Sequence, residues 1–392
     1  MSEWRVTAML RKMAERFRAW LAGDESETAV IPELANLPDR AWYELVDMAS
    51  DLIAPETTQR LTRESRALLT TNPGDAVLFG RLATRLADQP KDVTVLAIVS
   101  GDAWYAYALA LKEVAEFARA KAACEQAEFF YHLDIETVDG IAVSAHQKQL
   151  ALCALIRGRV MCSMGDRSGL EVMAKACLSL WSQGETVKYV EGRTLYASAL
   201  VGFGDYAQAM RVFQDTLTVA RRDGDESVEA YISNNIGMCY SALGEIKKAR
   251  QCFANALKLF ERRGDLAEVP RVRFNLAVAL KSSGRYAEAV SELHKVQAEF
   301  LVLGMPVVAA QVLMEIVETK FVSNRQGDIA RLCDLVLPTF LAAGLPREAE
   351  RAMAYLREVS QRLMLREEDI TGVRAFLDRL EASPATTFTP PA

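Results

Sequence analysis

Few residues in this chain have the type and spacing that catalysis or metal binding requires. The three histidines, His132, His146 and His294, are not paired at the spacing of metal ligands. His146 has the side chain of a general base, but a lone helix histidine is more often structural or solvated. The sequence also contains no glycine-rich phosphate loop, no G-x-S-x-G elbow and no H-E-x-x-H motif. We therefore expect a chain that is not an enzyme and holds no metal or other cofactor. The alternative is an active site in residues 1–105 that leaves no motif.

The cysteines point to packing rather than to redox or metal chemistry. None of the seven forms a C-x-x-C pair, which argues against a zinc cluster and a disulfide framework. Each lies within an apolar helical pattern, where a thiol acts as a small hydrophobe. The sequence thus predicts structural thiols in a reducing compartment. They are Cys124, Cys153, Cys162, Cys177, Cys239, Cys252 and Cys333.

Composition limits the classes of partner. The 392 residues are 51% hydrophobic, which is enough for a sizeable core. The 46 basic and 52 acidic residues give a net charge of −6, whereas non-specific nucleic-acid binding needs clustered positive charge. The start of the chain lacks the apolar stretch of a signal peptide, and the uncharged run 300–314 is too short to span a bilayer. We expect a cytoplasmic, soluble protein with no transmembrane segment and no nucleic-acid partner.

Glycines divide the second half of the chain into repeats of two elements. One series has a constant spacing of 40 residues, and a second series with spacings of 39, 40 and 40 lies between its members. Glycine tolerates the left-handed conformation that ends a helix, as does the Asn324 that continues the second series. Each repeat therefore predicts a helix, a short turn, a second helix and another turn. The first series is Gly184, Gly224, Gly264, Gly304 and Gly344, and the second is Gly165, Gly204, Gly244 and Gly284.

The apolar residues between these glycines follow helical spacing and identify the kind of repeat. Small and aromatic residues alternate in one pattern, which is clearest at Gly237, Tyr240, Gly244, Ile246, Ala249, Phe253 and Ala256. This pattern resembles the tetratricopeptide repeat (TPR) family over about residues 105–382. The period of 40 exceeds the usual 34 and is similar to that of kinesin light chains, spindle-orientation adaptors and bacterial peptide-sensing regulators. The resemblance implies an all-α fold, a right-handed α-solenoid of antiparallel helix pairs, with Phe253 filling the gap between adjacent repeats.

The rest of the chain is expected to be helical at the start and disordered at the end. Residues 1–22 form one amphipathic helix, which either binds a membrane surface or partner, or packs on the end of the solenoid. Residues 40–104 are either degenerate repeats or a separate helical bundle. The expected segments are 1–22 (amphipathic helix), 23–39 (linker), 40–104 (helical region), 105–382 (repeat array) and 383–392 (disordered Pro/Thr-rich tail).

The resemblance also implies a site, because the first helix of each pair lines a concave groove. In long-repeat members, asparagines on these helices bond the backbone of a bound segment, and Asn235 and Asn275 match that place. Glu315 breaks the series one repeat later, which favours a short site. The alternative is that each asparagine bonds within its own repeat. With modest positive charge, the face suits a segment with some acidic residues. The predicted site residues are Asn235, Asn275, Asn234, Tyr231, Met238, Arg271, Lys281 and Arg193.

The repeats and the absence of catalytic motifs leave two functions open. The first is a non-catalytic adaptor that binds a segment of a partner protein in the concave groove of the repeats. The second is a peptide- or ligand-responsive regulator of the bacterial type, whose superhelix changes shape on binding. Assembly of the chain into a homo-oligomeric scaffold is compatible with the first function.

Overall fold

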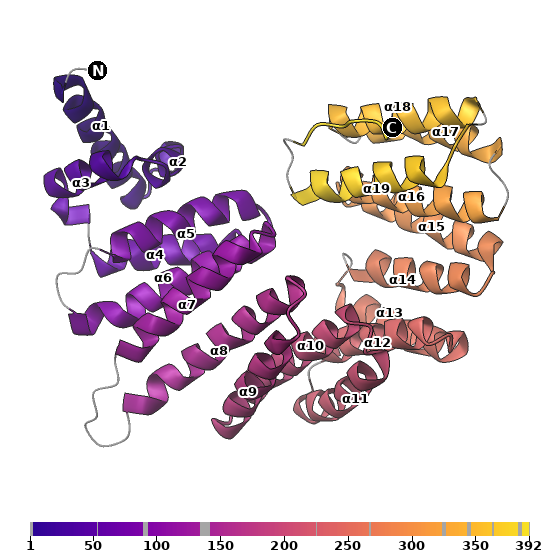
Figure 1. Cartoon of the computed structure of the whole chain (residues 1–392), viewed down its shortest axis with the longest axis horizontal. Helices are drawn as coiled ribbons and strands as arrows, with labels where there is room; N and C mark the ends of the chain where they lie inside the picture. Colours follow the sequence, from indigo (N-terminus) through magenta and orange to yellow (C-terminus); the bar gives the residue numbers. More distant parts are fainter. Residues whose placement is uncertain are drawn as a thin grey trace. The chain divides into compact units, whose positions relative to one another are not determined.

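We describe the protein from a computed structural model. It describes residues 3–52, 54–88, 93–133, 142–224, 226–265, 268–323, 327–342, 346–362, 364–382 and 386–391. In these ranges every regular element is helical, and the helices follow one another as antiparallel pairs (Figure 1). The predicted all-α solenoid of helix pairs is confirmed. None of the described helices is both long enough and apolar enough to span a membrane.

Internal contacts divide the chain into two compact units, Met1–Gly202 and Phe203–Ala392. The first unit contains α1 (Glu3–Leu21), a 3-10 helix (Glu25–Glu27), α2 (Val30–Ala35), α3 (Asp39–Met48), a 3-10 helix (Ser50–Leu52), α4 (Pro55–Ala67), α5 (Pro73–Ala87), α6 (Val93–Glu113), α7 (Phe117–Leu133), α8 (Ala142–Ser163), α9 (Ser168–Ser182) and α10 (Thr186–Gly202). The second contains α11 (Tyr206–Asp223), α12 (Glu226–Ala242), α13 (Ile246–Arg263), α14 (Glu268–Ser282), α15 (Tyr286–Val302), α16 (Pro306–Val322), α17 (Gly327–Ala342), α18 (Arg347–Gln361) and α19 (Glu367–Ala382).

Left-handed glycines end the helices where the sequence predicts turns. Gly224 caps α11 with φ 74°, and Gly264 caps α13 with φ 77°. The described members of both glycine series have φ between 71° and 84°. A side chain at such a position would strain the backbone, so the helix stops and the chain turns back. Gly344 and Asn324 lie outside the described residues.

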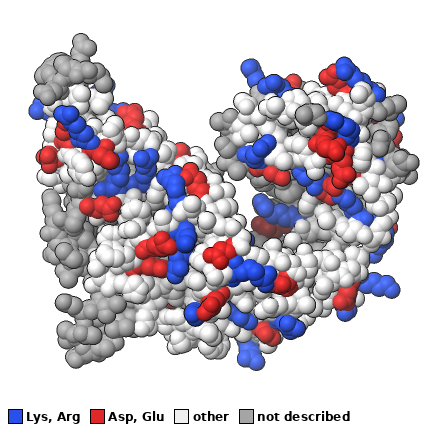
Figure 2. Space-filling model, viewed as in Figure 1, with Lys and Arg blue, Asp and Glu red and all other residues white. Residues whose placement is uncertain are grey.

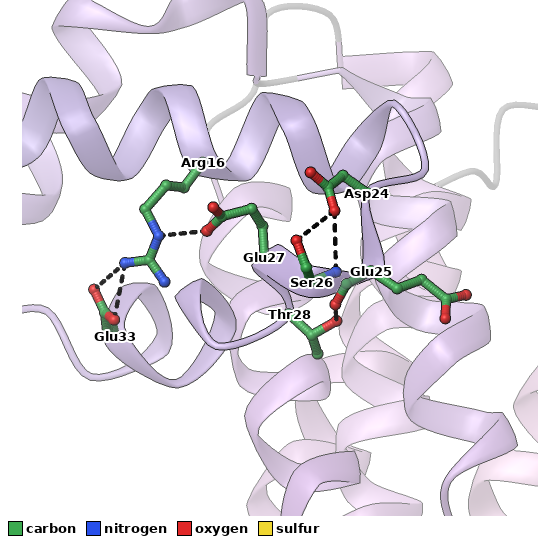
Figure 3. A network of polar contacts seen from close by, with 7 residues as sticks. All are labelled: Arg16, Asp24, Glu25, Ser26, Glu27, Thr28 and Glu33. Carbon is green, nitrogen blue, oxygen red and sulfur yellow. Dashed lines mark hydrogen bonds and ion pairs between the residues drawn. The ribbon is translucent and has the colours of Figure 1, made fainter.

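The first helix packs onto its neighbours instead of presenting a free apolar face. Leu10, Met13, Phe17 and Trp20 are buried in a cluster that includes residues of α2, α3 and α5. On the polar side, Arg16 donates to the carboxylates of Glu27 and Glu33, as Figure 3 shows. α1 therefore packs against other helices of the chain, which is the second of the two alternatives given for residues 1–22.

Three expected boundaries are wrong. Residues 23–39 are not a linker, because α2 buries Val30, Ile31, Leu34 and Ala35. Pro32 lies in the first turn of α2, where a helix tolerates proline because the missing N–H has no helical partner. The boundary between 104 and 105 falls inside α6, which pairs with α7.

The third wrong boundary is at the C-terminal end. In the tail expected to be disordered, Phe388 is only 5% exposed and joins the core of the last helices. A single aromatic side chain thus anchors a segment whose composition is typical of disorder.

The core of the best-matched repeat is built around Phe253. The ring is fully buried on α13 and faces Gly237 of α12, where an added Cβ would lie 2.7 Å from it. The same cluster contains Val269 and Val272 of the next pair, so Phe253 belongs to a core shared by neighbouring repeats.

The cysteines are free thiols, and burial raises the pKa of Cys239 to about 11.

Phe253→Ala is expected to lower the free energy of unfolding by about 3–5 kcal/mol, because it leaves a cavity in this closed cluster. Lys258→Ala, at an exposed position of the same helix, should change it by less than about 0.5 kcal/mol. Urea unfolding followed by circular dichroism measures both. Equal effects of the two substitutions would show that α13 does not bury the face assigned to it.

Candidate functional site

A pocket of about 340 Å³ opens in the second unit on the first helices of three consecutive pairs. These helices are α12, α14 and α16, and α15 contributes one residue from behind. Since the three helices are equivalent elements of successive repeats, they present the same face. The pocket is lined by Tyr231, Asn234, Glu268, Arg271, Phe274, Asn275, Phe300, Val308, Gln311 and Val312.

Two asparagines from successive repeats bond to each other at the pocket. Nδ2 of Asn275 donates to Oδ1 of Asn234 across 3.0 Å, which joins α14 to α12. Nδ2 of Asn234 lies 3.9 Å from Sδ of Met238, a weak acceptor. The amide pair therefore keeps both donor and acceptor capacity that a ligand backbone can use.

The sequence predicts that Asn235 and Asn275 lie on one face, and in the structure Asn275 bonds to Asn234, another predicted site residue. Asn234, not Asn235, faces Asn275 and lines the pocket. Asn235 is half-buried and is not among the lining residues. Because one step along a helix turns the side chain by about 100°, consecutive asparagines point in clearly different directions. Bonding of Asn275 within its own repeat, the alternative interpretation, is not what the structure has.

The rim of the pocket carries opposite charges, and its floor is apolar. We call Glu268 and Arg271 of α14 and Tyr231 of α12 the rim, and the apolar lining residues Phe274, Phe300, Val308 and Val312 the floor; Phe300 and Val312 are buried. The Tyr231 ring packs edge-on against Phe260 at 5.0 Å. Partial burial, together with the negative charge of Glu268, raises the pKa of Tyr231 to about 12.

Lys281 does not line the pocket, although the sequence placed it on this face. Its ammonium lies 2.6 Å from a carboxylate oxygen of Glu315 and 3.0 Å from one of Glu318. Arg374 of α19 pairs with the same two carboxylates. Lys281 is thus one cation of a four-residue cluster that joins α14, α16 and α19. Its charge is balanced within the fold, which reduces the positive charge expected for the site.

Two more predicted residues are not among those that line the pocket. Met238 is 38% exposed, and its sulfur touches Asn234 one turn before it. Arg193 belongs to α10 in the first unit, where its guanidinium lies 5.8 Å from the centre of the Tyr196 ring. The structure therefore brings Tyr231, Asn234, Arg271 and Asn275 together, and it does not add Asn235, Met238, Lys281 or Arg193 to their pocket.

Sequence reasoning missed the apolar floor of the pocket and the polar lining residue Gln311. Phe274, Phe300, Val308 and Val312 have the spacing of ordinary core residues, so nothing in the sequence separates them from the core. Gln311 had a signal, because Tyr231, Arg271 and Gln311 are each 40 residues apart.

Among the described residues, no group of three or more His, Cys, Asp or Glu side chains is arranged to hold a metal ion. On the face seen in Figure 2, positive and negative side chains are interspersed.

Comparison with known proteins identifies the helical repeats. Residues 228–296, which cover most of α12 to α15, match the family model described as tetratricopeptide repeat. Response regulator aspartate phosphatase I of Bacillus subtilis is 27% identical over 128 residues, which are 30% of this chain. The match spans one third (33%) of that relative's length.

Two solved structures share the fold. The apo form of RapI has a TM-score of 0.52 at 16% identity and covers 97% of this chain and 100% of its own. A signal transduction ATPase with a TPR sensor from Pyrococcus horikoshii has a TM-score of 0.54 at 13% identity, with 93% of this chain and 54% of that one covered. Residues 228–296 thus match tetratricopeptide repeats, and the chain has the helical-repeat fold of these two structures.

The environment of Tyr231 gives a test of the pocket that needs no ligand. In a spectroscopic pH titration, the difference between the wild type and Tyr231→Phe should be centred near pH 12 rather than at the ordinary value of 10. Because the folded pKa is raised, Tyr231 stabilises the folded state below about pH 10, and this contribution is lost as pH rises through 12. Glu268→Gln should move the midpoint back toward 10. A difference centred at 10 in both backgrounds would refute this rim geometry.

Proposed function

We propose that the pocket on α12, α14 and α16 binds an extended segment of a partner protein or a free peptide, and that the chain acts by binding rather than by catalysis. The observation that carries this proposal is the Asn234–Asn275 amide pair beside an apolar floor. An extended backbone offers one N–H and one C=O per residue, which amide side chains complement without selecting a side chain. An apolar side chain of the same segment fits between Phe274, Val308 and Val312.

The ligand site is short and nearly balanced in charge. Glu315 takes the place of an asparagine one repeat after Asn275, and it is 5% exposed under the ion pairs with Lys281 and Arg374. This supports a ligand that spans little more than three helices. Arg271 faces the pocket together with Glu268, so we expect recognition of one acidic group at most, rather than of a strongly acidic segment.

A second function is a ligand-responsive regulator. The relative that matches 30% of this chain is named as a response regulator phosphatase. The observation that favours regulation is that the pocket joins three consecutive repeats. A ligand that binds all three would fix their spacing, because each repeat contacts mainly its neighbours. Small-angle scattering with and without a bound peptide tests this, and an unchanged radius of gyration would exclude it.

The neighbouring asparagines provide a matched pair of variants for the main proposal. Asn234→Ala with Asn275→Ala should weaken partner binding by about 1–3 kcal/mol, roughly 5- to 150-fold in Kd, because two hydrogen-bonding amides are lost. Asn235→Ala removes the same amide one position away and should leave binding unchanged. A crosslinked pull-down from the native cell identifies the partner, and titration with it measures Kd. If all three chains bind alike, the pocket is not the site.

A further inference from the structure

The segment that follows α19 docks onto the last two helices in the manner of a bound peptide. Phe388 is 5% exposed, and its ring meets Phe376 of α19 edge-on at 5.1 Å and Tyr355 of α18 at 5.8 Å. In Figure 1 this segment, in yellow, ends beside α18. Its neighbours Thr387 and Thr389 are exposed, so Phe388 is the buried side chain in this part of the segment.

A second anchor explains a glycine in the middle of α19. A Cβ on Gly372 would lie 2.5 Å from Cγ of Pro391, so no larger residue fits while Pro391 is in place. Glycine within a helix costs about 1 kcal/mol relative to alanine. The close approach of Pro391 explains why glycine stands at position 372 despite this cost. Pro391 lies three residues after Phe388. The two anchors of the segment thus meet two places on the helices: Phe388 meets the rings of Tyr355 and Phe376, and Pro391 meets Gly372.

The Tyr355 ring of this aromatic contact is also held by hydrogen bonds that do not involve the segment. The Tyr355 hydroxyl donates to Asp369 at 2.5 Å, and the fully buried Asp369 also accepts from the backbone N–H and the guanidinium of Arg366. The bond to Asp369 holds the Tyr355 ring through its hydroxyl, and the ring also contacts Phe388. A preorganised aromatic wall lowers the entropic cost of docking.

α19, the helix under this segment, is also tied to the wall of the ligand pocket. Asp378 accepts a hydrogen bond from Nε2 of Gln311 across 3.2 Å, and Gln311 lines the pocket. Arg374, on the same helix, pairs with Glu315 and Glu318 of α16. Docking of the segment on α19 thus acts on a helix that contacts α16, and α16 lines the pocket.

We propose that Tyr355, Gly372 and Phe376 form a docking site for a segment with an aromatic residue followed three residues later by proline. Residues 386–391 of the same chain occupy it, and their docking holds α19 against α16. The site lies on α18 and α19 and does not depend on what the pocket binds. Its failure is therefore separate from failure of the proposed function.

The test uses the full-length chain, hydrogen exchange of residues 367–382, and a synthetic peptide of residues 383–392. Phe388→Ala should speed exchange in α19, and the added peptide should restore protection. The Phe388→Ala chain should bind the peptide at least tenfold more tightly than the wild type, because the tethered segment competes at high effective concentration in the wild type. A peptide with alanine in place of Phe388 is the matched control.

Unchanged exchange in the variant, equal binding by wild type and variant, or equal protection by both peptides would each overturn the proposal. Gly372→Ala is the second variant and tests the anchor at Pro391. Its methyl group occupies the place of Pro391, so this chain should bind the peptide of residues 383–392 less tightly than the Phe388→Ala chain does, an effect that the higher helix propensity of alanine does not produce. Equally tight peptide binding by Gly372→Ala and Phe388→Ala would contradict the second anchor.

Discussion

At eight positions in the described part of the chain, a helix gives way to a glycine with φ between 71° and 84°. A residue with a Cβ is strained in this conformation, so the position of each glycine sets where a helix stops and the next one starts. Since the spacing is 40 residues from Gly184 to Gly304, residues 40 apart occupy equivalent positions on α10, α12, α14 and α16. Everything described for the pocket depends on this, because equivalent positions on α12, α14 and α16 then face one side.

The same constraint explains how much of the site the sequence could predict. Tyr231 and Arg271 lie 40 residues apart and both line the pocket, as expected for equivalent positions. The asparagine prediction used the same period and selected Asn235, whereas the hydrogen bond joins Asn275 to Asn234. A contact between neighbouring helices depends on their relative rotation and shift. A repeat period shows which positions are equivalent, but it does not show how far neighbouring helices are rotated or shifted relative to each other.

Other differences arise from contacts between residues that are distant in sequence. Lys281 has the spacing of a groove residue, but its partners come from α16, and Arg374 of α19 shares them. Phe300 has the pattern of a core residue in a second helix, and it reaches the pocket from α15. Val30 and Phe388 lie in segments whose prolines suggested linker and disorder. Burial of a few apolar side chains outweighs such local preferences, and composition alone does not reveal the partner surface.

The pocket thus ends at the ion pairs of Glu315, and α19 is connected to it through α16. α19 is held both by its bonds to α16 and by its contact with Phe388. The ion pairs of Glu315 and Glu318 close the face beyond Asn275, and Arg374 connects that closure to α19. Balanced charges in this cluster leave the amide pair and the apolar floor as the features available to a ligand. A short segment recognised mainly through its backbone is the ligand that such a surface favours.

The most direct test places a photocrosslinking amino acid at Phe274, in the floor of the pocket, and irradiates the native cell. A second chain carries the same amino acid at Arg250, which is exposed on α13 and does not line the pocket. We expect a specific peptide or protein segment crosslinked at position 274, absent at position 250, and lost when Asn234 and Asn275 are both alanine. The same products at both positions, or products that persist in the double variant, would contradict binding in this pocket.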